Sequence, residues 1–153
     1  MTTMTEQATQ VYQVFIKATP EQIWEAITTP EFTMQYFHGS RVEGEWESGG
    51  AYRGYSPDRS QVWVEGEVLE SDPPRRLQHT WRSLYSEDQA KEPASRVTWE
   101  IEERDGGVSI LRVTHDELER SPLTAVGVSG EGWMHVISGL KTLLETGRPL
   151  FAE

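Results

Sequence analysis

Apolar and polar residues alternate with a period of two along most of the chain between residues 40 and 115. In "RVTWEIE", Val97, Trp99 and Ile101 alternate with threonine and glutamate, which is typical of a strand with one buried and one solvated face. The same pattern, interrupted by turns rich in glycine, proline and aspartate, predicts several antiparallel strands. Their expected ranges are 41–46, 50–55, 62–70, 76–83, 96–104 and 107–115, after a first strand at 11–18.

Helical patterns flank this run of strands. In "TPEQIWEAITTP", Thr19 is a suitable N-cap, Pro20 suits the first helical position, and Gln22 completes a capping box. Pro30 ends this helix, and a second short helix is expected over residues 31–37.

A longer helix is expected from Trp133 to Gly147, because its apolar residues fall on one side of a helical wheel. Glycines at 127, 130 and 132 disfavour a regular helix before it, and residues 84–95 are expected to form the longest polar loop. The long helix is the one element able to cover the apolar face of the sheet. Its apolar residues are Trp133, Val136, Ile137, Leu140, Leu143 and Leu144.

The length and composition restrict the class of protein but do not indicate a function. The 153 residues suit one domain, expected over residues 11–150 after a flexible N-terminus at 1–10. The formal charge of −11 argues against a nucleic-acid partner or an anionic membrane surface, since both require positive charge. There is no cysteine, no signal-peptide pattern and no apolar run long enough to span a bilayer. We therefore expect a cytoplasmic protein, either a monomer or a homodimer.

Six motifs make the sequence recognisable when they are read in order. Each is weak alone, but their fixed order covers residues 10–147. They are "IKATPEQIWEAITTPE", "SGGAY", "GEVLESDPPRRLQHTW", "SRVTWEIEE", "VTHDEL" and "GWMHVISGLKTLLETG".

On these motifs the sequence resembles the SRPBCC (START-like) superfamily, in the group similar to the C-terminal domain of the activator of heat-shock-protein-90 ATPase. The resemblance implies an α+β helix-grip fold. In it, a curved antiparallel β-sheet of about six to seven strands wraps around a long C-terminal α-helix, with two short helices after strand 1 and a cavity between sheet and helix. It also implies that residues 127–132 lie near the mouth of that cavity.

Three polar side chains are expected on the inward face of the sheet. In "RLQHTW", alternation places His79 between Leu77 and Trp81, while His115 ends the last strand and Tyr52 follows a glycine pair. A mostly apolar cavity with few polar groups suits a small hydrophobic or aromatic ligand. The predicted lining is Tyr36, Phe37, Tyr52, Val64, Val68, Leu77, His79, Trp81, Val97, Trp99, Leu111, Val113, His115, Trp133, Ile137 and Leu140.

A purely structural role is the alternative for both histidines, as buried residues hydrogen-bonded to the backbone. The family more often has an aromatic residue at the position of His79, which makes this histidine either a packing substitute or a polar contact with the ligand. If it only packs, we expect His79→Phe to change the free energy of unfolding by no more than about 1 kcal/mol.

No catalytic, metal or cofactor motif is recognised. The spacing of His38, His79 and His115 matches no metal motif. In "GVSGEG", Glu131 stands where the G-x-S-x-G motif of serine hydrolases needs glycine, and the same glycines fail the dinucleotide fingerprint. We therefore predict no catalytic residue, no metal and no cofactor.

Three functions from different classes stay open. The first is a ligand-binding protein, which predicts a cavity larger than a few waters. The second is a cyclase or aromatase, which predicts that His79, His115 or Tyr52 converge on that cavity. The third is a chaperone-associated stress-response protein, which predicts a filled core and an exposed binding patch. The co-chaperone of the family title carries a further N-terminal domain, for which this chain has no room, so full co-chaperone activity is not expected.

Overall fold

The computed structural model describes residues 9–129 and 131–151. The expected flexible N-terminus at residues 1–10 falls mostly outside these ranges, and Gln10 already begins β1. The elements in chain order are β1 (Gln10–Ile16), α2 (Pro20–Thr28), α3 (Pro30–Tyr36), β2 (Arg41–Gly44), β3 (Ala51–Tyr55), β4 (Val62–Asp72), β5 (Arg76–Ser83), α4 (Glu87–Ala90), β6 (Ser95–Glu103), β7 (Ser109–Asp116), α5 (Pro122–Val128) and α6 (Glu131–Thr146).

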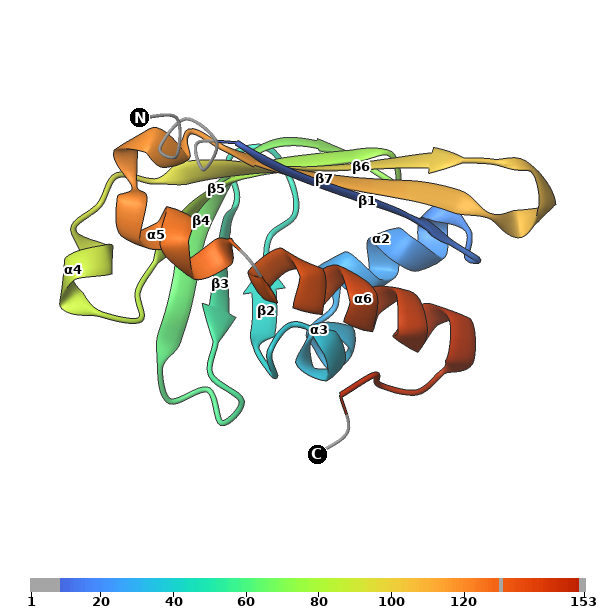
Figure 1. The fold of residues 1–153 in the computed structure, drawn as a ribbon, viewed down its shortest axis with the longest axis horizontal. Coiled ribbons are helices and arrows are strands. Elements are labelled where there is room, and N and C mark those ends of the chain that lie inside the picture. Colours follow the sequence, from blue (N-terminus) through green and yellow to red (C-terminus); the bar gives the residue numbers. More distant parts are fainter. Residues whose placement is uncertain (1–8, 130, 152–153) are drawn as a thin grey trace.

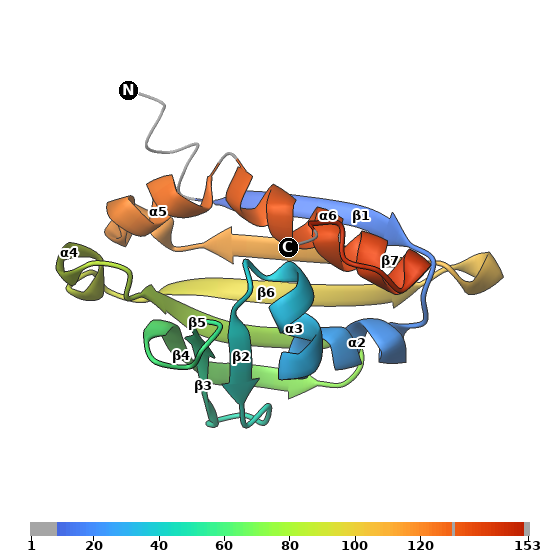
Figure 2. The same cartoon turned by 90° about the horizontal axis from the view of Figure 1, so that it is seen from below.

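The seven strands form one antiparallel sheet in the order β1-β7-β6-β5-β4-β3-β2. Strands β1, β7 and β6 extend above α6, whereas β2, β3 and β4 bend down beside it (Figure 1). Helices α2, α3, α5 and α6 all lie on the same face of the sheet (Figure 2). This is the curved sheet around a long C-terminal helix that the sequence predicted, with two short helices after the first strand. No helix of the described residues is long and apolar enough to cross a membrane.

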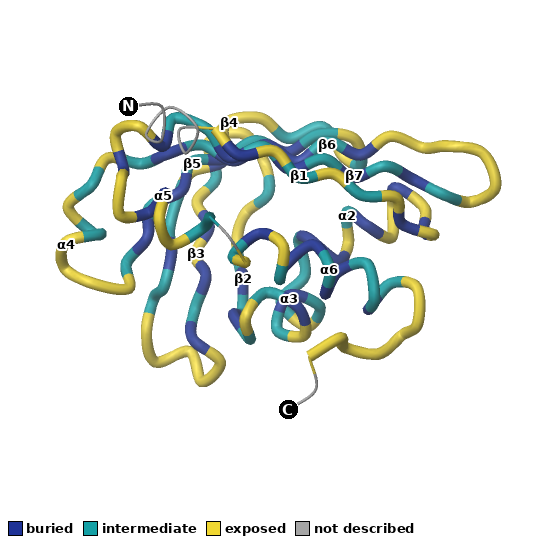
Figure 3. Tube along the Cα trace, in the orientation of Figure 1, coloured by how far each residue is buried: buried dark blue, intermediate teal, exposed yellow. Residues whose placement is uncertain are grey.

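The buried core lies between the concave face of the sheet and these helices (Figure 3). The apolar stripe predicted for α6 is confirmed, with Trp133, Val136, Ile137, Leu140 and Leu143 buried and Leu144 partly buried. Gly139 allows α3 to cross α6 closely, because a Cβ there would lie 3.1 Å from the Cβ of Tyr36.

The capping box predicted for α2 is present. The Thr19 hydroxyl oxygen accepts from the Gln22 N–H at 3.1 Å, and the Gln22 side-chain oxygen accepts from the Thr19 N–H at 2.9 Å. Both orphan donors at the start of the helix are therefore satisfied within the motif.

Two expectations about helices were wrong. Helix α5 occupies Pro122–Val128 and α6 begins at Glu131, where glycines were expected to prevent regular helix before Trp133. The supposed loop at 84–95 also contains the short helix α4, whose N-cap Ser86 accepts from the Gln89 N–H at 3.2 Å. Local propensity was outweighed in both places by capping and tertiary contacts.

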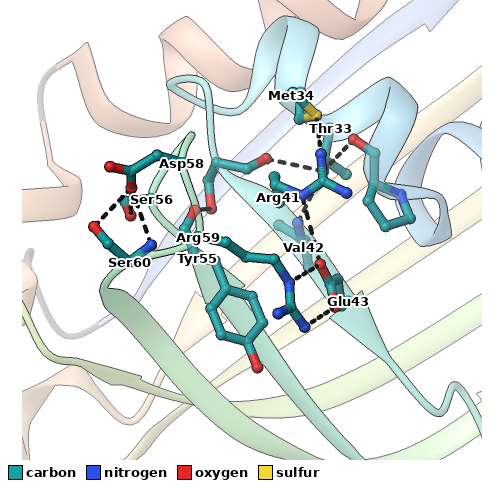
Figure 4. Close-up of polar contacts among 12 residues, drawn as sticks. Thr33, Met34, Arg41, Val42, Glu43, Tyr55, Ser56, Asp58, Arg59 and Ser60 are labelled. Carbon is teal, nitrogen blue, oxygen red and sulfur yellow. Dashed lines mark hydrogen bonds and ion pairs between the residues drawn. The ribbon is translucent and has the colours of Figure 1, made fainter.

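Polar contacts tie the β2 edge of the sheet to α3 and to the β3–β4 turn (Figure 4). The hydroxyl oxygen of Thr33 accepts from the Val42 N–H at 3.0 Å. Arg59 donates two hydrogen bonds of 2.8 Å to Glu43 and lies over the Tyr55 ring, 4.5 Å from its centre. These contacts fix the curled end of the sheet against the helical layer.

Candidate ligand-binding site

His79 is a fully hydrogen-bonded core residue. Its side chain is inward, as predicted, and the residue is 3% exposed. Its Nε2 accepts from the indole N–H of Trp99 at 3.0 Å, so its Nδ1 carries the proton and donates to the Thr80 carbonyl at 2.9 Å. Burial lowers the pKa of His79 to about 4, which keeps the imidazole neutral near pH 7.

His115, like His79, accepts a hydrogen bond from a tryptophan and so forms a second histidine–tryptophan pair. The indole N–H of Trp133 donates to its Nδ1 at 3.0 Å, and its Nε2 lies 2.7 Å from the Ser95 hydroxyl oxygen. The Ser95 hydroxyl donates onward to the carbonyl of Trp81 at 3.2 Å. Burial, and then the neighbouring His79, lower the pKa of His115 to about 3. This pair joins α6 directly to β7.

The side chain of Tyr52 extends from β3 past β4 to β5. Its hydroxyl donates to the Thr80 carbonyl at 2.6 Å, and its ring lies 4.5 Å from the imidazole of His79. Gly66 leaves the space for this ring, because a Cβ there would lie 2.5 Å from the Cε1 of Tyr52. Burial, and then Glu65, raise the pKa of Tyr52 well above its ordinary value. Its hydroxyl is therefore a neutral structural donor.

The inner cavity beneath the sheet is small. It has a volume of about 20 Å³, comparable to the space needed for one water molecule. Seven of the predicted cavity residues line it: Phe37, Tyr52, Val64, Leu77, His79, Trp81 and Trp99. These side chains therefore mostly fill the core around His79.

A larger pocket, called here the aromatic pocket, has a volume of about 400 Å³. Of the predicted cavity residues it includes Phe37, Trp81 and Trp133. The full lining is Phe37, His38, Trp63, Trp81, Ser83, Tyr85, Gln89, Thr124, Gly127, Val128, Gly132, Trp133 and Val136. The other predicted residues line neither this pocket nor the inner cavity, and all are buried: Tyr36, Val68, Val97, Leu111, Val113, His115, Ile137 and Leu140.

Aromatic rings make most of the pocket wall. Phe37, Trp81 and Trp133 contact one another, with ring centres 5.7 to 6.2 Å apart. Trp63 and Tyr85 form a second pair at 5.8 Å. Flat apolar surfaces of this kind favour an apolar or aromatic ligand.

Four polar side chains complete the lining, in different environments. Ser83 and Thr124 are buried, Gln89 is half-buried and His38 is exposed. His38 stacks on His135 with ring centres 4.2 Å apart, and desolvation followed by the charge of His135 lowers the pKa of His38. The pocket therefore offers a few neutral hydrogen-bonding groups among aromatic rings.

The loop before β6 and helix α5 are joined at one edge of the pocket. The Glu92 carboxylate accepts from the backbone N–H groups of Leu123 at 2.7 Å and Thr124 at 3.1 Å. It also accepts from the Thr124 hydroxyl at 3.1 Å. The carboxylate thus caps the start of α5 and holds two walls of the pocket together.

Sequence reasoning missed the residues that these two segments supply. Trp63 was not among the residues predicted to line the cavity. Tyr85 and Gln89 were assigned to a polar loop, and Thr124 to a segment without a predicted helix. The available signal was the resemblance, which placed residues 127–132 near a cavity mouth; Gly127, Val128 and Gly132 do line the aromatic pocket.

The three histidines considered for a metal do not come together as a metal site. His38 stacks with His135, whereas His79 and His115 accept from different tryptophans. Within residues 9–129 and 131–151, no group of three or more His, Cys, Asp or Glu residues is arranged to hold a metal ion.

Several solved structures share this fold. CalU16 from Micromonospora echinospora is 23% identical, with a TM-score of 0.69 over 91% of this chain and 77% of that chain. Protein MLL2253 from Mesorhizobium loti is 25% identical, with a TM-score of 0.71 over 89% of this chain and 96% of that chain. PFC0360w, an HSP90 activator from Plasmodium falciparum, is 18% identical, with a TM-score of 0.69 over 90% and 96%.

No curated protein matches the sequence. Residues 17–145 match the family described as activator of Hsp90 ATPase homolog 1-like protein. This range includes every strand from β2 to β7, both short helices after β1 and nearly all of α6. The chain therefore belongs to the activator of Hsp90 ATPase homolog 1-like family.

Proposed function

We propose that this protein binds a small apolar or aromatic molecule in the aromatic pocket. The observation that carries the proposal is a pocket of about 400 Å³ whose walls include five aromatic residues. Small-molecule sites typically have volumes of roughly 300 to 1,000 Å³ and mostly apolar walls with a few polar groups. The aromatic residues are Phe37, Trp63, Trp81, Tyr85 and Trp133.

A cyclase or aromatase acting in this pocket has less support. That alternative requires His79, His115 or Tyr52 to reach the ligand, and none of them lines the aromatic pocket. His79 and His115 accept hydrogen bonds from buried tryptophans, and Tyr52 donates to the Thr80 carbonyl of the sheet. A chaperone-associated role predicts a docking patch rather than a pocket, and the likeness to the HSP90 activator at 18% identity concerns the fold alone.

We also propose that the protein acts in the cytoplasm as a monomer or a homodimer, without a nucleic-acid partner. The net charge of −11 supports the last point, because a nucleic-acid surface requires positive charge. Light scattering after gel filtration measures the oligomeric state.

Native mass spectrometry of protein purified from its own host is the first test of binding. The expected result is a co-purifying small molecule in addition to the mass of the 153-residue chain. Equilibrium dialysis with fluorene, a flat uncharged hydrocarbon, provides a second test that does not depend on the natural ligand.

A pocket-filling variant connects that binding to the proposed site. Gly127 and Gln89 both line the pocket, and a Cβ at Gly127 would lie 3.7 Å from the Nε2 of Gln89, so the ring in Gly127→Phe should take up ligand space. We expect this variant to lose at least about tenfold in fluorene affinity. The matched control is Val126→Phe on the same helix, where the side chain is 63% exposed and affinity should not change. Equal fluorene binding by both variants would place the ligand elsewhere and overturn the proposal.

A further inference from the structure

We propose that Ser83 selects the ligand, by donating a hydrogen bond to an uncharged acceptor oxygen on a flat aromatic molecule. This inference rests on the proposed function and adds the chemical class of the ligand. It also assigns a specificity-determining residue.

Ser83 lies at the end of the inward row of β5. The row runs through Leu77, His79 and Trp81 and ends at the Ser83 hydroxyl, beside the aromatic pocket. Ser83 is only 2% exposed, so its hydroxyl is a buried group rather than part of a solvated rim.

The donor capacity of this hydroxyl is unused. The indole N–H of Trp81 donates to the Ser83 oxygen at 3.1 Å, which occupies one lone pair and leaves the O–H free to donate. Among the hydrogen bonds of the described residues, the Ser83 O–H has no acceptor. A buried donor without an acceptor costs free energy that a ligand oxygen can recover.

The other buried hydroxyl in the lining shows the contrast. Thr124 donates its proton to the carboxylate of Glu92 at 3.1 Å, so it has none to offer to a ligand. Ser83 is also well positioned, since the Trp81 ring that donates to it stacks on Phe37 and the Trp81 carbonyl accepts from Ser95. The donor is therefore held in place before the ligand arrives.

The rest of the lining sets the charge and shape of the ligand. Among the described residues that line the aromatic pocket there is no Lys, Arg, Asp or Glu. An ionic ligand would lose water without gaining a charged partner, which is costly. Aromatic walls favour a flat ring system, and Ser83 then favours a carbonyl, ether or similar neutral oxygen on it.

Matched probes test the role of Ser83. Fluorenone and fluorene have nearly the same shape and differ by one carbonyl oxygen, so the ratio of their affinities reports a hydrogen bond to that oxygen. Equilibrium dialysis measures this ratio in the unmodified protein and in Ser83→Ala. We expect the fluorenone-to-fluorene ratio to fall by about fivefold to tenfold in Ser83→Ala, with the affinity for fluorene itself unchanged.

Two controls separate recognition from folding. Ser83→Thr keeps the hydroxyl and should restore the ratio to within about twofold, and thermal melts show whether each variant folds. A carboxylate derivative of fluorenone should bind at least about tenfold more weakly than fluorenone.

The outcomes distinguish the two proposals. If fluorene binds but the ratio is the same in Ser83→Ala, the role of Ser83 is wrong while the proposed function stands. If the carboxylate binds as well as fluorenone, the uncharged ligand class is wrong. If the unmodified protein binds neither uncharged probe, both proposals fail.

Discussion

Each of the two buried histidines accepts a hydrogen bond from a tryptophan, and this gives each imidazole a defined protonation state. His79 accepts from Trp99 and His115 from Trp133, so protonating the accepting nitrogen would replace an attraction by a repulsion between two N–H groups. Parity along β5 predicted that His79 faces inward. The hydrogen bond from Trp99 was not predicted, because Trp99 pairs with Leu77 across the ladder and reaches His79 diagonally.

We expect acid to destabilise the fold through these histidines. Their pKa values fall from about 6.5 in the unfolded chain to about 4 and about 3, so below pH 6.5 the unfolded state binds more protons. The stabilisation from both is complete above about pH 6.5 and declines as the pH falls toward these folded-state values. Urea unfolding at about pH 7.5 and about pH 5.5 should differ by roughly 1 kcal/mol per histidine.

The control for this pH effect is the double variant His79→Phe with Trp99→Phe, which removes one titrating pair. Its loss of stability over the same pH interval should be smaller than that of the unmodified protein by roughly 1 kcal/mol, which is the contribution of His79. An unchanged pH dependence would show that other groups cause it.

His79→Phe should cost more than packing alone would suggest. The variant leaves the indole N–H of Trp99 buried without an acceptor, and we expect a loss of about 1 to 3 kcal/mol in the free energy of unfolding. Trp99→Phe should cost less when His79 is already Phe, because the donor then has no acceptor to lose. Additive losses in the double variant, measured by urea unfolding, would rule out the coupling.

At the scale of elements, α5 shows why the segment before α6 was not predicted as helical. Gly127 lies near its end, and Leu123 and Val126 are exposed, so the segment has little helical signal of its own. Its first N–H groups are capped by Glu92, a residue about thirty positions earlier in the chain. Because the capping residue is so distant in sequence, the tertiary fold brings it to the helix, and the residues around α5 do not indicate it.

Removing this cap should loosen α5. Glu92→Ala leaves the N–H groups of Leu123 and Thr124 without their acceptor, and their amide hydrogen exchange should become about fivefold faster. Glu119→Ala is the matched control, since Glu119 is an exposed acid just before the same helix. If both variants exchange at the same rate, the carboxylate does not hold the helix.

At the scale of the whole molecule, the sheet curls where β4 meets β5. Their pairing shifts register between Val68 and Glu70, and close to this irregularity Tyr52 donates to the Thr80 carbonyl. The sequence predicted the fold class, since strand periodicity and the final helix leave few arrangements. It did not predict the aromatic pocket, because that pocket depends on the curl and on two short helices that were not expected. Helix α5 is capped by the distant Glu92, and the local signal for α4 is limited to its N-cap Ser86.

The curl depends on the absence of a side chain at Gly66. In Gly66→Ala the new Cβ would overlap the Thr80 carbonyl oxygen and lie 2.5 Å from Tyr52, so we expect a loss of at least about 2 kcal/mol in the free energy of unfolding. Gly127→Ala is the control, because the nearest atom there is 3.7 Å away and alanine favours a helix. Similar denaturant midpoints for the two variants would contradict this account of the curl.

The walls of the aromatic pocket come from residues as far apart in the chain as Phe37 and Val136. A site assembled from such distant parts exists only in the folded chain, so any molecule that occupies it shifts the folding equilibrium by mass action. At a free concentration of one hundred times its dissociation constant, a ligand would add about 2.7 kcal/mol of stability, enough to raise the melting temperature by several degrees. A melting curve recorded across a collection of metabolites would therefore find the natural ligand without an assay for what the protein does with it.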